Sequence, residues 1–485
     1  MGIGAVVCPS QFPSASMSAQ RIFMSNNLTV GSPTRVIITF TFPLLIGNLF
    51  QQVYQFTDAA VVGRLIGVDA LAAVGATGSL LFLLLGFTFG ASGGLAIPIA
   101  RAYGAGDSQA LRRHFANGIR IAIGIAATIL AVGVLFAGDL LELMQTPQEL
   151  MVDAHLFLAI SFWGAPVVMA YNLLAAVIRA LGDSRTPLYF LMISCLLNVI
   201  LVVVFIGGLG WGVAGAALAT VVAQLVSVVL CIWLIARRMP QLHLSRADWR
   251  SEPGDLGESL RPGLAMGFQM SVIAIGAVVL QYAVNGLGAE SVAAFTAAMR
   301  VDQLAVAPLS SFGLALTTFV AQNRGAGQWA RIRVGVWRTS LVTWGLSVLL
   351  GAVVIGLGTP IVRLFVGAGE AQVVAMAHDY LIVQGLLYPI LASVFVLRNA
   401  IQGLGSTMVP TVAGFMELIL RSAAGLLLVV PFGFMGVAAA APLAWVGALL
   451  PITVAWFGWR RALLGLPDGA AEPERVSRLG LARAS

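Results

Sequence analysis

Apolar segments long enough to cross a membrane follow one another along almost the whole chain. A helix needs roughly 20 apolar residues to span the hydrocarbon core of a bilayer. The segments that meet this condition lie at approximately 36–58, 71–98, 119–138, 154–178, 188–207, 212–235, 263–286, 296–320, 339–358, 377–401, 411–431 and 436–458. The pattern therefore predicts an all-α polytopic membrane protein with twelve transmembrane helices.

Several short motifs recur in the same order about 220 residues apart. The matching pairs are Pro43 with Pro262, GVDALAAVG (67–75) with GAESVAAFT (288–296), ARAYGAGD (100–107) with AQNRGAGQ (321–328), IRALGDSRTP (178–187) with IQGLGSTMVP (401–410), and WGVAGAALA (211–219) with MGVAAAAPL (435–443). Because each copy would hold an even number of helices, both copies enter the membrane from the same side. We therefore expect parallel repeats that form two six-helix bundles.

The repeat predicts how the chain is divided. We expect a first lobe over residues 35–236 and a second over 262–460, joined by the polar linker 237–261. The segments 1–34 and 461–485 would form tails on either side of the lobes.

Charge distribution supports a membrane protein rather than a nucleic-acid-binding protein. Only 10% of the residues are charged and the mean hydropathy is +0.94, whereas soluble domains carry about 25% charged residues. The net charge is +7, and every basic residue is an arginine. These arginines concentrate in the tails and in every second connection, which by the positive-inside rule predicts that both termini are cytoplasmic.

The sequence offers little for enzymatic chemistry. Cys8, Cys195 and Cys231 show no paired spacing, so neither a disulfide framework nor a metal site is expected. There is no Walker A loop and no HExxH motif, and the four histidines are scattered. The first 33 residues also lack the organisation of a signal peptide. We expect no cofactor, and transport by this chain would have to use an ion gradient.

One carboxylate, Asp58, stands at the far end of about twenty uncharged residues that begin after Arg35. An ionised side chain at the bilayer centre costs ~2.5–3.5 kcal/mol, so an embedded acid has to be paired, hydrated or protonated. Gln51, Tyr54 and Gln55 precede Asp58 by seven, four and three residues, which places all four on one helix face. Two interpretations stay open: Asp58 anchors the helix end near the outer interface, or it is shielded and exchanges a proton.

Further polar residues lie in the predicted helices 188–207 and 212–235. Ser194 and Asn198 are one turn apart in the first, and Thr220 and Gln224 are one turn apart in the second. Taken singly, each is typical of a hydrogen bond between membrane helices. The second repeat lacks counterparts to Asp58, Asn198 and Thr220, so this polar set belongs to the first half alone.

The second half carries different charges. Glu417 and Arg421 are four residues apart in the predicted helix 411–431, a spacing at which an acid and a base meet on one face. Arg300 and Asp302 are expected at the mouth of the predicted helix 296–320. Arg398 is expected to extend toward the cytoplasmic interface.

Together these motifs make the chain similar to the multidrug and toxic compound extrusion (MATE) transporters over residues 35–460. The resemblance rests on PLLIGNLFQQVYQFTDAAVVGRLIGVDALAAVG (43–75), ARAYGAGD, IRALGDSRTP, GLGWGVAGAALAT (208–220), AQNRGAGQ, IQGLGSTMVP and ELILR (417–421). It implies a V-shaped pair of six-helix lobes that exports amphipathic, often cationic compounds in exchange for H⁺ or Na⁺.

The resemblance also implies roles for particular residues. In many prokaryotic members an Asp in the first helix is the coupling carboxylate, and Asp58 occupies that place; Asn198 and Thr220 match polar partners of the cation site. A second Asp often found four residues after the Asn is Val202 here, which favours H⁺ over Na⁺ because a hard cation prefers more oxygen ligands. Other branches use acids in the seventh and tenth helices. This chain has Gln269 in the first of these regions and no acid deep in the second.

The leading hypothesis is an inner-membrane, proton-coupled drug exporter that works as a monomer by alternating access. A flippase for lipid-linked precursors shares this architecture and would need a cationic cavity, for which Arg300 and Arg421 are the candidates. A membrane-embedded enzyme and a passive channel are further alternatives.

Overall fold

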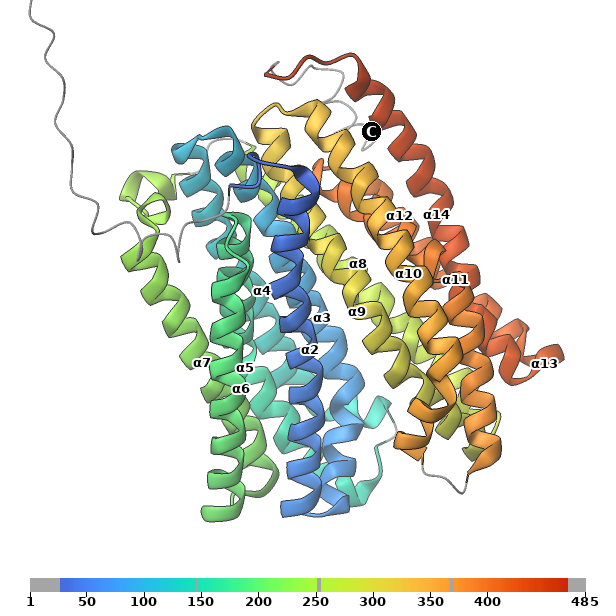
Figure 1. Cartoon of the computed structure of the whole chain (residues 1–485). Coiled ribbons are helices and arrows are strands. Elements are labelled where there is room, and N and C mark those ends of the chain that lie inside the picture. Colours follow the sequence, from blue (N-terminus) through green and yellow to red (C-terminus); the bar gives the residue numbers. More distant parts are fainter. Residues whose placement is uncertain (1–26, 145, 251–253, 367–369, 470–485) are drawn as a thin grey trace, which may run out of the picture.

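The computed structural model describes residues 27–144, 146–250, 254–366 and 370–469, except for the side chains of residues 55, 56, 58–60, 68, 69, 71 and 365. In this part the chain is helical and contains no strand. The helices carry the labels of Figure 1. The first bundle consists of α2 (Pro33–Leu65), α3 (Val68–Ala105), α4 (Ser108–Leu143), α5 (Gln148–Ala180), α6 (Arg185–Val202) and α7 (Gly212–Arg238).

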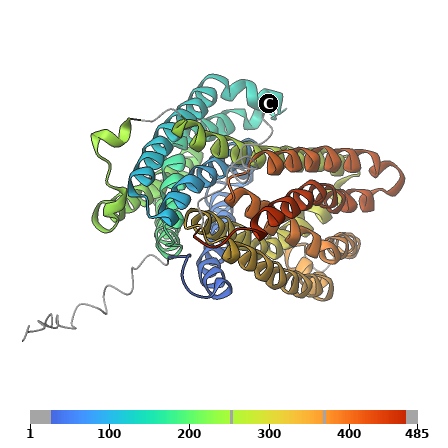
Figure 2. The same cartoon turned by 90° about the horizontal axis from the view of Figure 1, so that it is seen from above.

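The second bundle consists of α8 (Asp255–Asn285), α9 (Ala289–Gly325), α10 (Trp329–Val366), α11 (Ala371–Gly403), α12 (Met408–Leu427), the short α13 (Val429–Phe432) and α14 (Phe434–Leu464). Twelve of the described helices are long and apolar enough to cross a membrane. Seen from above, the blue-to-green helices gather on one side and the yellow-to-red helices on the other (Figure 2). The predicted fold class is therefore confirmed.

The helices extend beyond the predicted apolar segments because polar turns continue them at their ends. The segment predicted at 119–138 is the middle of α4, which begins at Ser108. The Asp107 side chain caps this helix by accepting hydrogen bonds from the backbone N–H groups of Gln109 and Ala110, at 3.0 and 2.9 Å. A capped amphipathic turn of this kind carries no run of apolar residues, so hydropathy alone does not reveal it.

Two irregular segments interrupt the membrane helices. A π-helical turn, η1 (Val203–Gly208), continues α6 toward α7. On the other side of the molecule, α12 ends at Leu427 and Gly433 turns the chain into α14 with a φ of 55°. The predicted helix 411–431 is therefore divided in the structure.

Between the bundles, residues 239–250 form two short 3-10 turns, η2 (Pro240–Leu242) and η3 (Arg246–Trp249), and α8 already begins at Asp255. Ion pairs hold this connection to the first bundle. Arg112 of α4 lies 3.3 Å from Asp248, and Arg101 of α3 lies 2.8 Å from Glu258. The first turns of α8 thus belong to the stretch that the sequence predicted as linker.

The two bundles meet most closely at the end of the molecule that holds the α3–α4 and α9–α10 connections, and we call this the closed end. A Cβ atom at Gly104 would overlap the carbonyl oxygen of Gln322, and one at Gly325 would overlap that of Arg101. Gly104 matches Gly325 in the repeat, and Arg101 matches Gln322. The two contacts are therefore reciprocal across the pseudo-twofold axis.

The bundles diverge away from the closed end (Figure 1). Along α3, the glycines that touch α8 backbone lie in the half toward the closed end: Cβ atoms at Gly90 and Gly94 would overlap the carbonyls of Met266 and Pro262. In contrast, Gly75 and Gly78 in the other half have no neighbour within 4 Å. Between α2 and α9, Asn48 donates a hydrogen bond of 2.8 Å to Ser311.

The first and last described residues both lie at the closed end. The backbone N–H of Leu28 donates to the side chain of Gln322 at 3.0 Å, and Asp468 accepts from the backbone of Ala330 at 2.9 Å. The two ends of the described chain are thus on the same side of the molecule, as an even number of membrane helices requires.

Candidate functional site

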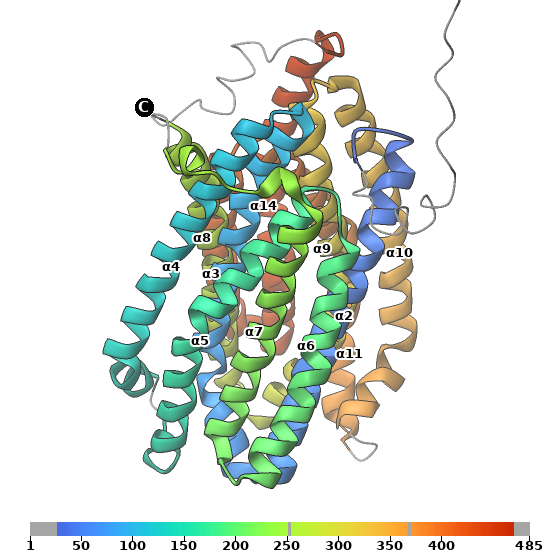
Figure 3. The same cartoon turned by 90° about the vertical axis from the view of Figure 1, so that its left-hand side faces the viewer.

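A hydrogen-bonded polar cluster joins α2, α6 and α7, which lie side by side (Figure 3). The Thr220 hydroxyl accepts a 3.1 Å hydrogen bond from the Asn198 side-chain amide and lies 3.3 Å from the Tyr54 hydroxyl. Thr220 also donates to the carbonyl of Ala216 at 3.3 Å. Either the Tyr54 or the Thr220 hydroxyl can be the donor between these two residues. The structure therefore brings together three residues that the sequence singled out.

The cluster has unused hydrogen-bond acceptors. The Asn198 Oδ1 and Gln224 Oε1 atoms are buried and have no hydrogen-bond partner among the described residues. Gln224 follows Thr220 by four residues, one turn along the same face of α7. A buried acceptor left without a donor is costly, and each such group calls for an explanation. Amide oxygens of this kind accept from a protonated acid or coordinate a cation.

Asp58 lies on α2 four residues after Tyr54, so its Cα is on the face that carries the cluster. Its side chain, like that of Gln55, lies outside the described part of the chain. Seven residues separate Asp58 from the last residue of α2, which places its backbone about 10 Å from that helix end. The choice between an anchoring and a proton-exchanging Asp58 therefore stays a prediction.

Two other residues that the sequence predicted for this site, Gln51 and Ser194, are not among the hydrogen-bonded residues of the cluster. Gln51 is exposed on α2, one turn before Tyr54, and has no hydrogen bond to the cluster. Ser194 is buried one turn before Asn198. At Val202, where a second acid is often found in the similar family, the side chain is apolar and buried.

In the second bundle, Glu417 is shared by two arginines. Its carboxylate oxygens accept 2.8 Å hydrogen bonds from Arg421, on the same helix, and from Arg398 of α11. The expected Glu417–Arg421 pair is present. The expectation for Arg398 is wrong, however: its side chain is only 6% exposed and binds Glu417 rather than reaching an interface.

Asp302 is also within the bundle rather than at its mouth, because α9 begins at Ala289 instead of residue 296. The Tyr388 hydroxyl of α11, which is fully buried, donates a 2.8 Å hydrogen bond to the Asp302 carboxylate. Tyr388 was not predicted from the sequence, since no local spacing connects the two residues. Arg300, two residues earlier, is exposed.

Gln269 of α8 is buried and accepts a 2.7 Å hydrogen bond from the Gln402 side chain of α11. At the position where related branches carry an acid, this chain therefore has an amide side chain that is hydrogen-bonded to a second amide.

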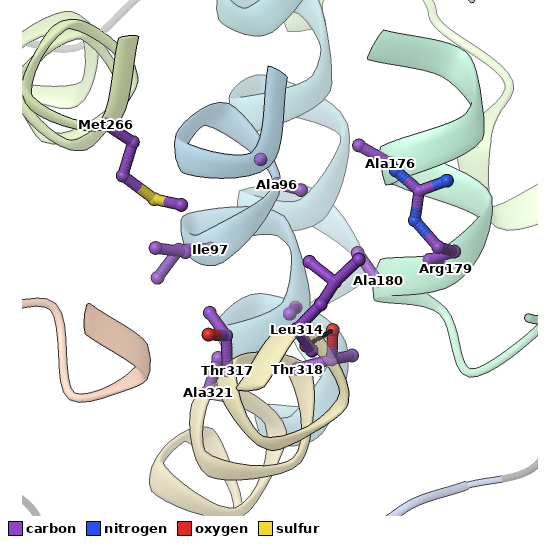
Figure 4. A pocket seen from close by; sticks show the side chains of 12 residues that line it. Ala96, Ile97, Ala176, Arg179, Ala180, Met266, Leu314, Thr317, Thr318 and Ala321 are labelled. Atoms are coloured by element: carbon purple, nitrogen blue, oxygen red, sulfur yellow. Dashed lines mark hydrogen bonds between the residues drawn. The ribbon is translucent and has the colours of Figure 1, made fainter. Parts of the chain in front are cut away.

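A small hollow lies between the bundles near the closed end. Side chains of α3, α5, α8 and α9 form its walls, and Figure 4 shows them surrounding it. The walls are largely apolar, with Ile97, Met266 and Leu314 among them, and Arg179 is their one charged side chain.

The segment Gly90–Gly94 has the Gly-x-Ser-x-Gly spacing of a hydrolase nucleophile turn. It lies in the interior of the continuous helix α3, whereas the nucleophile requires a strand-to-helix turn. The Ser92 hydroxyl donates to the sulfur of Met169 at 3.7 Å. This geometry argues against a serine nucleophile.

Comparison with known proteins identifies relatives. The family model described as MatE matches residues 43–204 and 265–445. The chain is 29% identical over 413 residues to the probable multidrug resistance protein YoeA of Bacillus subtilis, covering 83% of this chain and 88% of YoeA. It is 26% identical over 383 residues to the probable multidrug resistance protein YpnP of the same organism, covering 79% and 85% of the two chains.

The fold matches solved structures as well. One is a multidrug resistance MATE family transporter in an outward-facing conformation, with a TM-score of 0.82 and 20% identity, covering 94% of this chain and 99% of that one. Another, with the same TM-score and 21% identity, is a transporter of the MOP superfamily from Pyrococcus furiosus. At this identity, the likeness concerns the fold.

Proposed function

Since the chain belongs to the MatE family, whose members are membrane transporters and not enzymes, we propose that it exports amphipathic, often cationic drug-like compounds by exchange for H⁺. Two relatives that match most of its length are named as probable multidrug resistance proteins. The proposal assigns residues 35–236 and 262–460 to the two lobes, with 237–261 as their linker and the protein as a monomer.

The observation that carries the proposal is the pair of unused acceptors in the first lobe. Asn198 hydrogen-bonds Thr220 through its amide N–H, Gln224 follows Thr220 by one turn of α7, and the backbone of Asp58 lies one turn beyond Tyr54. A protonated carboxyl group can donate a hydrogen bond to such an acceptor, whereas an ionised carboxylate cannot. Uptake of a proton by Asp58 would thus create an attraction between α2 and α6 that the ionised state lacks.

This difference between the two protonation states provides a basis for coupling. A ligand shifts a conformational equilibrium only by binding one state better than the other, and here the proton is that ligand. Binding of a proton from outside would favour the conformation that releases substrate, and its loss would reset the lobe. Alternating access then follows from rocking of one lobe against the other.

The arginine-rich connections support an orientation with the closed end in the cytoplasm. The tails and the α3–α4, α5–α6, α7–α8 and α9–α10 connections carry most of the arginines. By the positive-inside rule, these segments would lie in the cytoplasm of a bacterial cell, and the closed end with them. In that orientation, a protein closed at this end would be in the outward-facing half of its cycle.

Proton coupling fits the site better than sodium coupling. Val202 provides no oxygen ligand, so the first-lobe cluster offers one carboxylate and neutral oxygens only. Loss of a carboxylate weakens a site for a hard cation, which prefers several oxygen ligands, whereas a proton needs one acid.

The flippase alternative finds less support. Of the two arginines that were candidates for lipid phosphate, Arg421 is engaged by Glu417 within the second lobe at 2.8 Å. Its positive charge is therefore largely neutralised.

The test is ethidium efflux from vesicles under separately imposed pH and Na⁺ gradients, comparing the wild type with Asp58→Asn. We expect efflux driven by the pH gradient in the wild type and none in Asp58→Asn, which keeps the shape but cannot ionise. The matched control is Asp139→Asn, which removes an exposed carboxylate near the end of α4.

The outcomes are distinct. Undiminished efflux in Asp58→Asn would remove this residue from the mechanism. Efflux driven by Na⁺ alone would overturn the ion assignment, and absence of ethidium efflux from the wild type under either gradient would reject export of this compound class.

A further inference from the structure

One embedded carboxylate of the second lobe, Asp302 of α9, has no cation in contact with it. Its side chain is partly buried and accepts a 2.8 Å hydrogen bond from the Tyr388 hydroxyl. Among the described residues, no arginine or histidine nitrogen lies within 4.0 Å of its carboxylate oxygens. In contrast, Glu417 of the same lobe is bound by two arginines at 2.8 Å. The charge of Asp302 is therefore not neutralised by direct pairing.

The titratable groups around Asp302 are two tyrosines and a distant arginine. Besides Tyr388, α11 contributes Tyr380, whose hydroxyl donates to the sulfur of Met299 at 3.4 Å. Arg421 of α12 acts on Asp302 from beyond 4.0 Å. The described side chains of α2, α3, α5, α8 and α10, which also pack against α9, contribute no charged group that acts on it.

Neither nearby arginine replaces a direct partner. The guanidinium of Arg421 is already bound to Glu417 at 2.8 Å. Arg300 is exposed and precedes Asp302 by two residues on α9, a spacing at which two side chains do not face each other. An acid embedded in this way has to be hydrated or protonated.

Asp302 lies at about the same depth as Asp58 in the other lobe. The helices α2 and α9 run in opposite directions and are joined by the 2.8 Å hydrogen bond between Asn48 and Ser311. Asp58 follows Asn48 by ten residues, and Asp302 precedes Ser311 by nine, so both backbones lie about 14 Å further from the closed end. The two acids thus belong to the region in which the bundles diverge (Figure 1).

The repeat shows that these two acids are not copies of one another. The residue that matches Asp302 in the first lobe is Leu81, and the positions that match Asp58 in the second lobe are the apolar residues 277–279. Each lobe therefore carries its own acid, on a different helix of the repeat. The architecture that the lobes share does not require a carboxylate at position 302, so packing alone leaves this charge unexplained.

We propose that Asp302 is a second proton-binding site, which takes up and releases a proton in the same transport cycle as Asp58. The proposal rests on the proposed export function and extends it: two protons, one in each lobe, are exchanged for each exported compound. Asp302 lies where the bundles diverge, so water from that end of the molecule can deliver the proton.

The contact with Tyr388 is compatible with both protonation states of Asp302. The Tyr388 side chain is fully buried, and its hydroxyl needs an acceptor. An ionised carboxylate accepts this hydrogen bond, and the carbonyl oxygen of a protonated carboxyl group accepts it as well. Asp302 can therefore change its charge without leaving a buried donor unpaired.

The first test is infrared spectroscopy of the purified full chain in dodecylmaltoside, recorded as difference spectra between about pH 5 and about pH 8. A protonated carboxyl group has a carbonyl stretching band that the carboxylate lacks. We expect the wild type to show such a band at low pH and to lose it as the pH rises. Asp302→Asn should lack the component that belongs to Asp302, whereas Asp302→Glu, which keeps an acid, should retain a pH-dependent component.

The Tyr388→Phe variant checks the assignment independently. It removes the hydrogen bond to the Asp302 carbonyl oxygen, so the Asp302 component should shift to higher frequency. The matched control is Asp379→Asn, which removes an exposed acid from α11 and should leave the difference spectrum of the wild type unchanged. A component that persists in Asp302→Asn, or that does not shift in Tyr388→Phe, would overturn the proposal.

Ethidium efflux connects the site to the transport cycle and separates the two proposals. With the membrane potential clamped at zero and a pH difference of about one unit, each exchanged proton raises the limiting ethidium gradient about tenfold. The gradient that Asp302→Asn sustains should therefore be at least about tenfold smaller than that of the wild type, and equal gradients would contradict a role in the cycle. If the wild type exports no ethidium, the proposed function fails, while the infrared component still decides whether Asp302 binds a proton.

Discussion

At the scale of single residues, the embedded charges around Glu417 in the second lobe are paired with one another. Glu417 has two arginine partners, and its side chain is only 9% exposed. A buried charge that is paired and hydrogen-bonded is tolerated, whereas removal of one partner leaves the others uncompensated. Glu417 therefore has a structural role.

Replacement of Glu417 by Gln should destabilise the second lobe. Arg398 and Arg421 would both remain at low exposure without a counter-charge, a situation that costs about 3–5 kcal/mol in buried pairs. We expect a markedly lower midpoint in thermal unfolding of the detergent-solubilised protein. Glu370→Gln, which neutralises an exposed acid before α11, should unfold like the wild type. An unchanged midpoint in Glu417→Gln would mean that the three charges do not depend on one another.

Only some of these residue pairs could be predicted from the sequence. The spacing of four residues exposed the Glu417–Arg421 pair, and the repeat showed that Asn198 and Thr220 belong to one half. The contact of Arg398 with Glu417 spans 19 residues and depends on how α11 packs against α12. The Tyr388–Asp302 hydrogen bond spans 86 residues. Such contacts have no local signature, so the sequence cannot reveal them.

At the scale of elements, the connection between the lobes is more ordered than its polar composition suggests. Ser245 and Asp248 form a capping box around η3: the Asp248 carboxylate accepts from the Ser245 hydroxyl at 2.6 Å and from its backbone N–H at 2.7 Å. Arg112 of α4 adds an ion pair at 3.3 Å. Local capping chemistry thus fixes a turn that hydropathy classifies only as linker.

This arrangement makes the linker sensitive to pH. The hydrogen bond from the Ser245 hydroxyl, followed by that from its backbone and by Arg112, lowers the pKa of Asp248 below its usual value of 3.8. An acid whose pKa is lowered by folding contributes stability above its unfolded pKa, and that stability is lost as the pH falls through the folded pKa. The turn should therefore stay docked at neutral pH and loosen only below about 4.

The neutral side chain of Asp248→Asn should reproduce the acid state at pH 7.5. We expect faster trypsin cleavage after Arg246 and Arg250 in this variant, measured by mass spectrometry of the products. Asp107→Asn, which instead neutralises the acid that caps α4, should not accelerate cleavage at these sites. Equal cleavage rates in the wild type and Asp248→Asn would show that the capping box does not hold the turn.

Element boundaries were predicted less well than element number. All twelve membrane helices were recognisable because each needs a long apolar run. Their ends were not, because first turns such as Asp255–Arg261 of α8 are polar and are stabilised by contacts with α3 and α4. The π-helical turn at Val203–Gly208 likewise has no signal in an uninterrupted apolar sequence.

At the scale of the whole molecule, the two lobes are held together at one end by backbone contacts that only glycine allows. Alanine at Gly104 or Gly325 would place a methyl group on the facing carbonyl oxygen, and the bundles would have to separate to accommodate it. Either substitution should therefore favour conformations in which the closed end is open.

This expectation can be measured with a single cysteine in the hollow. In a chain whose native cysteines are replaced by serine, Thr317→Cys should react faster with a maleimide added from the closed-end side when Gly104→Ala or Gly325→Ala is also present. Gly257→Ala is the matched control, because a Cβ there meets nothing within 4 Å. A reaction rate that neither glycine variant changes would show that these contacts do not determine closure.

The sequence predicted the two lobes but not which end would be closed. The repeat predicts two similar bundles in any conformation. The closed end depends on backbone approach between α3, α8 and α9, and one sequence can adopt both arrangements during a transport cycle.

The reciprocity of the Gly104 and Gly325 contacts restricts the order of events during opening. Gly104 faces the carbonyl of Gln322, and Gly325 faces the carbonyl of Arg101, which is the residue equivalent to Gln322 in the repeat. A rotation about the pseudo-twofold axis therefore lengthens both contacts equally. Neither contact can break before the other unless the axis itself tilts. The cycle should therefore pass this barrier in one concerted step, and a species with only half of the closure undone should not accumulate.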